Sequence, residues 1–409
     1  MGTAGVKPGG GRFIAGDPLR GIACLVVLFW HVAVASAGIV PPGGISPGLK
    51  GELGSLGPSV VTLSISVWFF FVLSGYLISG PFVRAVVRAD GRRPRLGAYA
   101  RNRVLRIVPG YWAILTFSLL IVGTAGDSLK HIALFYGFAH VYDQGPFTPR
   151  MVQAWTLDVE VIFYAAIPLL LLPLAGFLRG RWTPWARASV ILAGCAAVAA
   201  WSLTYGIRGP TSGLCVPGSL WAFTPGIALA TVEPLLRPRF EGRGFGRLAV
   251  WALVAVAIVA FLADTYVVDV KNGRQQNFVA AFACGAFLAA PLVLQWTTGG
   301  AWRWLDNRFL HWFGVRAYGI YLTHVVAIFE LRHLIARLGT VSSALLVVWP
   351  LVMVMSTIAG ALSYRYIERP FLERRVPWRS SDPAPAPEPE AVAVPFEPAP
   401  APAGIVTPP

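Results

Sequence analysis

Charged residues are scarce in this chain of 409 residues: they make up 13% of it, whereas 56% of the residues are hydrophobic. About a quarter of an average soluble domain is charged, so the composition excludes an ordinary water-soluble globular protein. Cysteine is also scarce, with Cys24, Cys195, Cys215 and Cys284 far apart. This spacing fits neither a metal site nor a disulfide framework, so we interpret the cysteines as small hydrophobic residues and predict no metal.

Acidic residues are the rarer charge, 19 against 34 Lys and Arg, which gives a net charge of +15. Such an excess can indicate nucleic-acid binding, but here the basic residues lie in short segments between apolar runs. Cytoplasmic loops of membrane proteins are enriched in Lys and Arg. With both termini in the cytoplasm, roughly 26 of the basic residues face inward and about 8 outward. The charge therefore predicts membrane orientation, and we expect no nucleic-acid partner.

Apolar runs of about 20 residues, the length needed to cross the hydrocarbon core, recur along the chain. They predict an all-α polytopic membrane protein whose transmembrane domain spans 17–375, preceded by a flexible arm at 1–16. A Pro/Ala-rich stretch, 380–409, predicts a disordered cytoplasmic tail. The ten expected helices are 18–38, 60–79, 107–123, 154–174, 189–206, 219–236, 248–267, 277–296, 317–336 and 342–364.

The first span carries two polar side chains on one face. Asp17 and Pro18 are typical of a helix start, with Asp17 as the cap and Pro18 at the first helical position. Arg20 then lies in the first turn, and His31 follows eleven residues later, about 16 Å along the same stripe. Such residues are costly at bilayer depth, and those that occur there usually have a function.

The most basic loop leads into the third span through Arg103 and Arg106, which share one helical face. Two guanidinium groups beside a helix N-terminus suit the oxygens of a phosphate. Anchoring of the span at the membrane surface, or contact with lipid headgroups, fits the same spacing equally well. The spacing alone leaves these interpretations open.

A polar stripe enters the fourth span, because Thr156, Glu160 and Tyr164 are four residues apart. A carboxylate inside lipid needs a partner or must take up a proton. Glu160 is therefore either functional or one half of a buried ion pair. Asp158 is nearer the interface, and we expect it to be solvated or to cap the helix.

Other polar residues have simple structural interpretations. His131 and His140 lie in an apolar segment, 128–142, that is too short to cross the membrane, and we expect both to be solvated. Ser74 is expected to be a small residue at a helix contact. His324 is a second intramembrane imidazole, for which a hydrogen bond to a neighbouring helix and a catalytic role are both open.

In chain order, these features resemble the acyltransferase-3 family of bacterial integral-membrane acyltransferases over roughly residues 13–375. Each motif is weak alone, but their order and topology together are specific. One departure is Ala317, where the family usually has a serine, and we expect that hydroxyl only to pack. The matching motifs are Arg20 with His31, Phe70-Phe71-Val72-Leu73-Ser74-Gly75-Tyr76-Leu77-Ile78, Arg103 with Arg106 before Ile107-Val108-Pro109, Trp155-Thr156-Leu157-Asp158-Val159-Glu160 with Phe163-Tyr164 and Pro168, Tyr318-Gly319-Ile320-Tyr321-Leu322-Thr323-His324, and Glu368-Arg369-Pro370.

The resemblance implies a membrane-bound O-acyltransferase of the bacterial plasma membrane. It would move an acyl group, commonly acetyl, from acyl-CoA to a hydroxyl of a sugar, glycan, lipid or secondary metabolite. We expect a stand-alone member without the extracellular hydrolase-like domain that some members carry. Direct transfer to the acceptor and a relay through an acyl-histidine are both open.

The resemblance also implies roles for the residues singled out above. We expect His31 to be the general base, because an ordinary imidazole pKa of about 6.5 suits proton removal at neutral pH. Glu160 and Arg20 would be catalytic with it. Coenzyme A is a cytoplasmic polyanion whose phosphates we expect at Arg103, Arg106 and Arg20, with Arg101 nearby. The expected substrate contacts are Trp155, Tyr164, Tyr321 and His324.

The main alternative is a transporter or flippase of a small molecule or a lipid-linked sugar, since ten spans with buried charges also suit solute movement. Against it, the sequence has no clear repeat that pairs its halves and no pair of helices broken by Gly or Pro. A scaffolding protein is a third interpretation. It does not account for Arg20, His31 and Glu160 at membrane depth.

Overall fold

The computed structural model describes residues 13–37, 53–89, 93–122, 128–142, 151–180, 182–205, 216–241, 246–267 and 273–377. Within these ranges the regular elements are helices, and none is a strand. Ten of the helices in the described ranges are long and apolar enough to cross a membrane. The predicted all-α polytopic fold is therefore confirmed. The predicted tail, most of the predicted N-terminal arm and Cys215 lie outside the described residues.

Each long helix overlaps one predicted span, although some begin or end several residues away from the predicted boundary. The shorter helices are α3 (Gly57–Thr62), α6 (Leu129–Tyr136), α9 (Val216–Ser219), α14 (Arg332–Leu338) and α16 (Arg369–Leu372). The long helices are α1 (Gly16–Ser36), α4 (Ile65–Arg88), α5 (Leu96–Val122), α7 (Trp155–Phe177), α8 (Pro184–Tyr205), α10 (Thr224–Phe240), α11 (Gly246–Tyr266), α12 (Gly273–Thr298), α13 (Arg308–Glu330) and α15 (Val341–Ser363).

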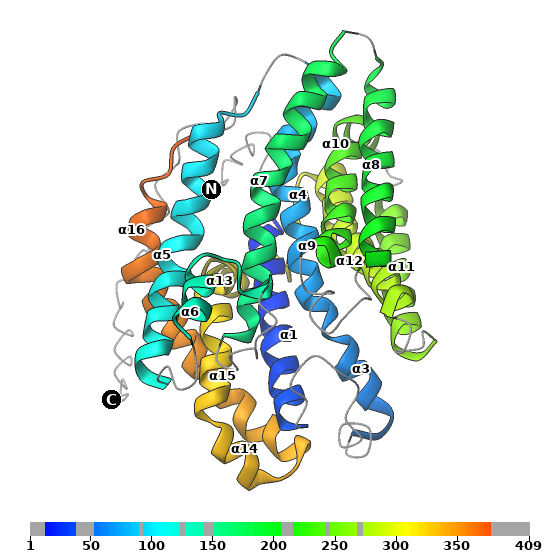
Figure 1. Cartoon of the computed structure of the whole chain (residues 1–409). Helices are drawn as coiled ribbons and strands as arrows, with labels where there is room; N and C mark the ends of the chain where they lie inside the picture. The colour runs from blue at the N-terminus through cyan, green and yellow to red at the C-terminus, as the bar shows by residue number, and fades with distance from the viewer. Residues whose placement is uncertain are drawn as a thin grey trace, which may run out of the picture.

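The long helices pack in two groups that meet at α4. One group consists of α8, α10, α11 and α12, which lie to the right of α4 and α7 in Figure 1. In the other group, α1 packs against α13 and α15, and α5 lies against α13 and the segment after α15. A π-helical turn at Tyr364–Glu368 joins α15 to α16. Helices from both halves of the sequence therefore surround α4.

Three helix pairs cross at glycine residues. Gly314 places α13 against α1, Gly226 places α10 against α4, and Gly360 places α15 against α13. A Cβ atom at any of the three would overlap a backbone atom of the facing helix. Gly75 likewise faces the backbone carbonyl of Phe223, so α4 closely approaches the segment before α10, next to Ser74, which was expected at a helix contact. Backbone contact therefore fixes α1 and α15 against α13, and α10 against α4.

The start of α1 differs from the prediction. The helix begins at Gly16, its N-cap is Ala15, and no side chain caps it. Asp17 lies inside the first turn, where its Oδ1 is 2.9 Å from Nη1 of Arg20. The predicted cap is therefore wrong, because the carboxylate faces its own helix and contacts the guanidinium one turn later.

The segment after α5 packs against the start of α7. His131 and His140 are only 7% and 2% exposed, and the ring of His140 stacks on Phe135 at 4.1 Å between centroids. Its Nδ1 lies 2.8 Å from Oδ2 of the fully buried Asp158, which also accepts the backbone N–H of Val141 at 3.0 Å. The predictions of solvated His131, His140 and Asp158 are wrong, because the segment folds back and brings the imidazole to the carboxylate.

Candidate active site

An open pocket lies among α1, α4, α5, α7 and α13. Among the described residues that line it, three are cationic and one is acidic, so the pocket favours an anionic ligand. The lining residues are Arg20, Val67, Phe70, Phe71, Ser74, Leu77, Ile78, Arg103, Arg106, Ile107, Thr156, Leu157, Glu160, Tyr164, Ala317, Tyr318 and Tyr321.

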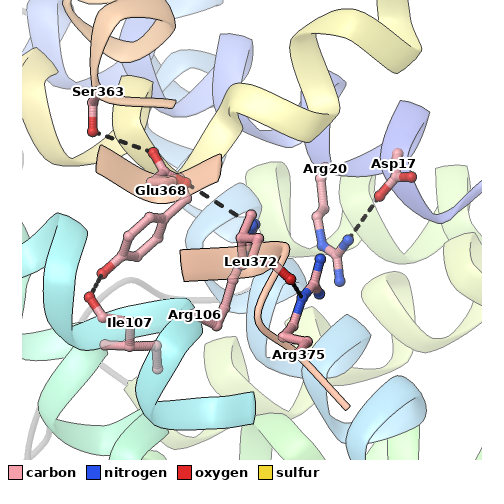
Figure 2. A network of polar contacts seen from close by, with 9 residues as sticks. Asp17, Arg20, Arg106, Ile107, Ser363, Glu368, Leu372 and Arg375 are labelled. Atoms are coloured by element: carbon pink, nitrogen blue, oxygen red, sulfur yellow. Dashed lines mark hydrogen bonds and ion pairs between the residues drawn. The ribbon is translucent and has the colours of Figure 1, made fainter. Parts of the chain in front are cut away.

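Two of the lining arginines are held by carboxylates outside the pocket (Figure 2). Arg20 pairs with Asp17, as described above, and a third of its side chain stays exposed. Nη1 of Arg106 is 3.9 Å from Oε2 of Glu368, whose other oxygen accepts the hydroxyl of Ser363 at 3.3 Å. The Glu368 side chain is 1% exposed, so its carboxyl group faces Arg106 and Ser363 rather than solvent.

Arg103 lies over two aromatic rings. Its guanidinium carbon is 5.8 Å from the ring centroid of Tyr99 and 5.4 Å from that of Tyr164, both within cation–π range. Because α5 begins at Leu96, Arg103 and Arg106 lie inside the helix and not beside its free N–H groups. The prediction that the two guanidinium groups lie beside a helix N-terminus is therefore wrong. Arg101 is exposed and does not line the pocket.

Glu160 is held by two hydroxyl groups from different helices. Ser74 on α4 donates to its Oε1 at 2.7 Å, and Tyr164 on α7 donates to the same atom at 2.6 Å. The prediction that Ser74 only packs is wrong, because its hydroxyl faces α7. Hydrogen bonds to a charged group stabilise by about 1.5–3 kcal/mol, so the two donors fix the carboxylate at the pocket wall.

Two tyrosines of α13 form the opposite wall. The hydroxyl of Tyr321 is 3.1 Å from that of Thr156, and its ring packs on Phe70 at 5.8 Å between centroids. The hydroxyl of Tyr318 donates to the backbone carbonyl of Ile107 at 2.7 Å and thereby joins α13 to α5. Trp155 was also expected at the substrate, but its ring packs among α4 side chains and does not line the pocket.

His31 and His324 lie together, outside the pocket lining. Nδ1 of His31 is 3.3 Å from Nε2 of His324, and the two rings meet edge to face at 4.7 Å. His324 is fully buried, whereas His31 is partly exposed. The ring of Tyr321 is 5.3 Å from that of His324 and also lines the pocket. Tyr321 therefore separates the arginine-lined pocket from the histidine pair.

Two residues of the pocket lining, Tyr318 and Ser74, were not predicted as site residues. A signal was present for Ser74, because it lies four residues after Phe70 and so shares its helical face. Tyr318 stands in the sequence only as the first residue of a matching motif, and its partner, the backbone carbonyl of Ile107, leaves no pattern in the sequence. In the described part of the chain, no group of three His, Cys, Asp or Glu side chains is placed to hold a metal ion.

Comparison with known proteins identifies the family of the chain. A family model described as an acyltransferase domain matches residues 16–365. Nodulation protein 10 of Rhizobium leguminosarum bv. viciae is 24% identical over 339 residues, covering 76% of this chain and 82% of that protein. The exopolysaccharide production protein ExoZ of Rhizobium meliloti (strain 1021) is 24% identical over 321 residues, covering 75% of this chain and 88% of that protein. No solved structure matches the chain.

A third relative is YrhL of Bacillus subtilis (strain 168), whose name proposes peptidoglycan O-acetyltransferase activity. It is 25% identical over 335 residues, which cover 75% of this chain and 50% of YrhL. The family match begins at the first residue of α1, includes every helix that lines the pocket and ends within the turn that joins α15 to α16. With ten apolar helices and a family match over most of its length, the chain belongs to the acyltransferase-3 family and is a multi-pass membrane acyltransferase.

Proposed function

We propose that this protein transfers an acyl group, most simply acetyl, from acyl-CoA to a hydroxyl of a carbohydrate in the bacterial cell membrane. Acyl transfer follows from the family. The carbohydrate acceptor is supported by the names of two relatives, which refer to exopolysaccharide and to peptidoglycan. The acyl-CoA donor is supported by the charge of the pocket.

The observation that carries the donor assignment is the convergence of Arg20, Arg103 and Arg106 on one pocket. Coenzyme A carries several phosphate groups, and guanidinium groups bind phosphate oxygens in a planar fork. The arginines lie near the ends of α1 and α5 that the distribution of Lys and Arg predicts to be cytoplasmic. Acyl-CoA is a cytoplasmic metabolite, so it would reach the pocket from that side.

The chemistry requires a base for the acceptor hydroxyl, and His31 is our candidate. Its imidazole would take the hydroxyl proton while the oxygen attacks the thioester carbonyl carbon. As the tetrahedral intermediate collapses, the C–S bond breaks and the thiolate of coenzyme A takes the proton back from His31. General-base help of this kind contributes about a hundred- to ten-thousand-fold in rate.

The distance between the arginines and His31 suits a long donor. Eleven residues separate Arg20 from His31 on α1, which is about 16 Å along the helix axis. In coenzyme A the pantetheine arm separates the phosphates from the sulfur. With the phosphates at the arginines, the arm would extend past Tyr321 and carry the thioester towards the histidine pair.

The proposal is tested in inverted membrane vesicles, which expose the cytoplasmic face to added [14C]acetyl-CoA. We expect alkali-labile label in the vesicle carbohydrate only when the chain is present. His31→Ala should reduce the label by at least about a hundredfold while purified protein still binds coenzyme A. His333→Ala, an exposed histidine of α14, is the matched control and should transfer normally. Absence of label with the unmodified protein overturns the function, and normal transfer by His31→Ala overturns the base.

A further inference from the structure

We propose that His324 is a positioning residue for His31, and that it leaves Nε2 of His31 as the proton-accepting nitrogen. This inference rests on the proposed function. It concerns the pair formed by α1 and α13, in which Nδ1 of His31 faces Nε2 of His324 at 3.3 Å. The hydrogen bonds of the two rings determine which nitrogen of each ring carries the proton.

The chain of hydrogen bonds begins at a backbone carbonyl. Nδ1 of His324 contacts the carbonyl oxygen of Tyr321. A carbonyl oxygen only accepts, so this nitrogen carries a hydrogen. In a neutral imidazole the other nitrogen is then an acceptor, which gives Nε2 of His324 a lone pair. Nδ1 of His31 faces this lone pair.

The tautomer of His31 is fixed in the same way. Its Nδ1 lies 3.0 Å from the carbonyl oxygen of Val27, one turn earlier in α1, as well as 3.3 Å from Nε2 of His324. Both of these neighbours accept, so Nδ1 of His31 carries the hydrogen and shares it between them. The lone pair of neutral His31 is therefore on Nε2. Two acceptors on one N–H hold a single tautomer.

This arrangement assigns His324 the task that a carboxylate performs in a Ser-His-Asp triad, where the third residue orients the imidazole and stabilises the imidazolium. When Nε2 of His31 takes a proton from the acceptor hydroxyl, its ring becomes cationic and its Nδ1–H becomes a stronger donor. A neutral imidazole stabilises this cation less than a carboxylate does. His324 is fully buried, and a neutral imidazole there avoids the cost of burying a second charge.

Two substitutions of His324 separate the proposed role from a structural one. Gln carries an amide oxygen close to the position of Nε2 and so keeps an acceptor for His31. Asn carries its amide nitrogen close to the position of Nδ1, so it keeps the bond to the Tyr321 carbonyl but leaves His31 without its partner. We expect His324→Asn to lower kcat for [14C]acetyl transfer in inverted vesicles about tenfold or more, with KM for acetyl-CoA unchanged. His324→Gln should retain most of kcat.

The opposite order, with His324→Asn active and His324→Gln impaired, would mean that only the bond to Tyr321 matters and would overturn the proposal. Equal activity of the two variants would overturn it as well. Both variants are compared at matched amounts of folded protein, measured by size-exclusion chromatography in detergent.

A second measurement does not need the acyltransferase activity. Protein with 15N-labelled histidine rings reports the protonation of each nitrogen by NMR, and His31→Gln identifies the His31 signals among the six histidines of the chain. We expect a pyrrole-type Nδ1 and a pyridine-type Nε2 for both His31 and His324. In His324→Asn the other His31 tautomer should appear. Nε2–H on His31 in the unmodified protein, or unchanged His31 signals in His324→Asn, would overturn the inference even if acyl transfer is demonstrated.

Discussion

Glu160 is the acidic residue among those that line the pocket, and replacing it with glutamine changes charge with little change in shape. The amide oxygen can still accept the hydroxyls of Ser74 and Tyr164, which lie 2.7 Å and 2.6 Å from Oε1. The negative charge beside the three arginines is lost. If the phosphates of coenzyme A bind these arginines, Glu160→Gln should strengthen binding and not weaken it.

The magnitude follows from Coulomb's law for a carboxylate and a phosphate on different walls of one pocket. Unit charges about 10 Å apart interact by about 0.8 kcal/mol at an effective dielectric constant of about 40 and by about 1.7 kcal/mol at about 20. Removal of the repulsion should therefore lower the Kd for coenzyme A by about four- to twentyfold. The gain should shrink as salt is added.

Isothermal titration of coenzyme A into purified protein at low and high salt measures this effect. Glu373→Gln is the matched control, because it removes one negative charge from a surface residue whose side chain is 56% exposed. We expect that variant to bind like the unmodified protein. If Glu160→Gln binds coenzyme A with equal or lower affinity, the phosphates do not sit among the pocket arginines and the donor assignment fails.

Two further substitutions test the pocket and the bundle. Arg106→Gln should raise the Kd for coenzyme A about tenfold by titration, since a guanidinium–phosphate contact is lost, whereas Arg101→Gln, outside the pocket, should have no effect. The double variant Arg106→Gln with Glu368→Gln also removes the buried carboxylate that Arg106 leaves unpaired. If its Kd returned to that of the unmodified protein, Arg106 would not contact the phosphate directly. Gly226→Ala should lower the midpoint of thermal unfolding, because the added Cβ overlaps the backbone of α4 and overpacking costs about 1–3 kcal/mol. Gly194→Ala is the control and should not lower the midpoint, because the space around Gly194 is open. Equal midpoints for the two variants would contradict the close crossing of α10 and α4.

The sequence predicts the fold well because the membrane imposes a simple rule. Apolar length alone identifies all ten helices, since each span must satisfy its own backbone hydrogen bonds. Helix ends are less predictable where a helix continues beyond the hydrocarbon. For α5, the basic residues before 107 were assigned to a loop, but the helix starts at Leu96. Charged residues can extend a helix into water, and hydropathy does not report this.

Several pocket residues are predicted one by one, but their arrangement is not. Arg20, Arg103 and Glu160 were all singled out, and they do line one pocket. Periodicity along one helix does not tell which helices face each other, so the partners of Glu160 and the pairing of His31 with His324 were not foreseen. The burial of His140 and Asp158 depends on a segment that folds back over α7, which is a tertiary contact with no local signal.

The three glycine crossings decide how the pocket can widen. Where backbones touch, two helices cannot slide past each other freely, so α1 and α13 are held together as one pair and α4 and α10 as another. The remaining walls, α5 and α7, meet these pairs through side chains, such as Tyr318 against Ile107 and Ser74 against Glu160. Side chains can change rotamer at modest cost. Room for a bulky nucleotide would therefore come from outward movement of α5 and α7, and crosslinks that tether α5 to α13 and α7 to α4 would slow the loading of the enzyme.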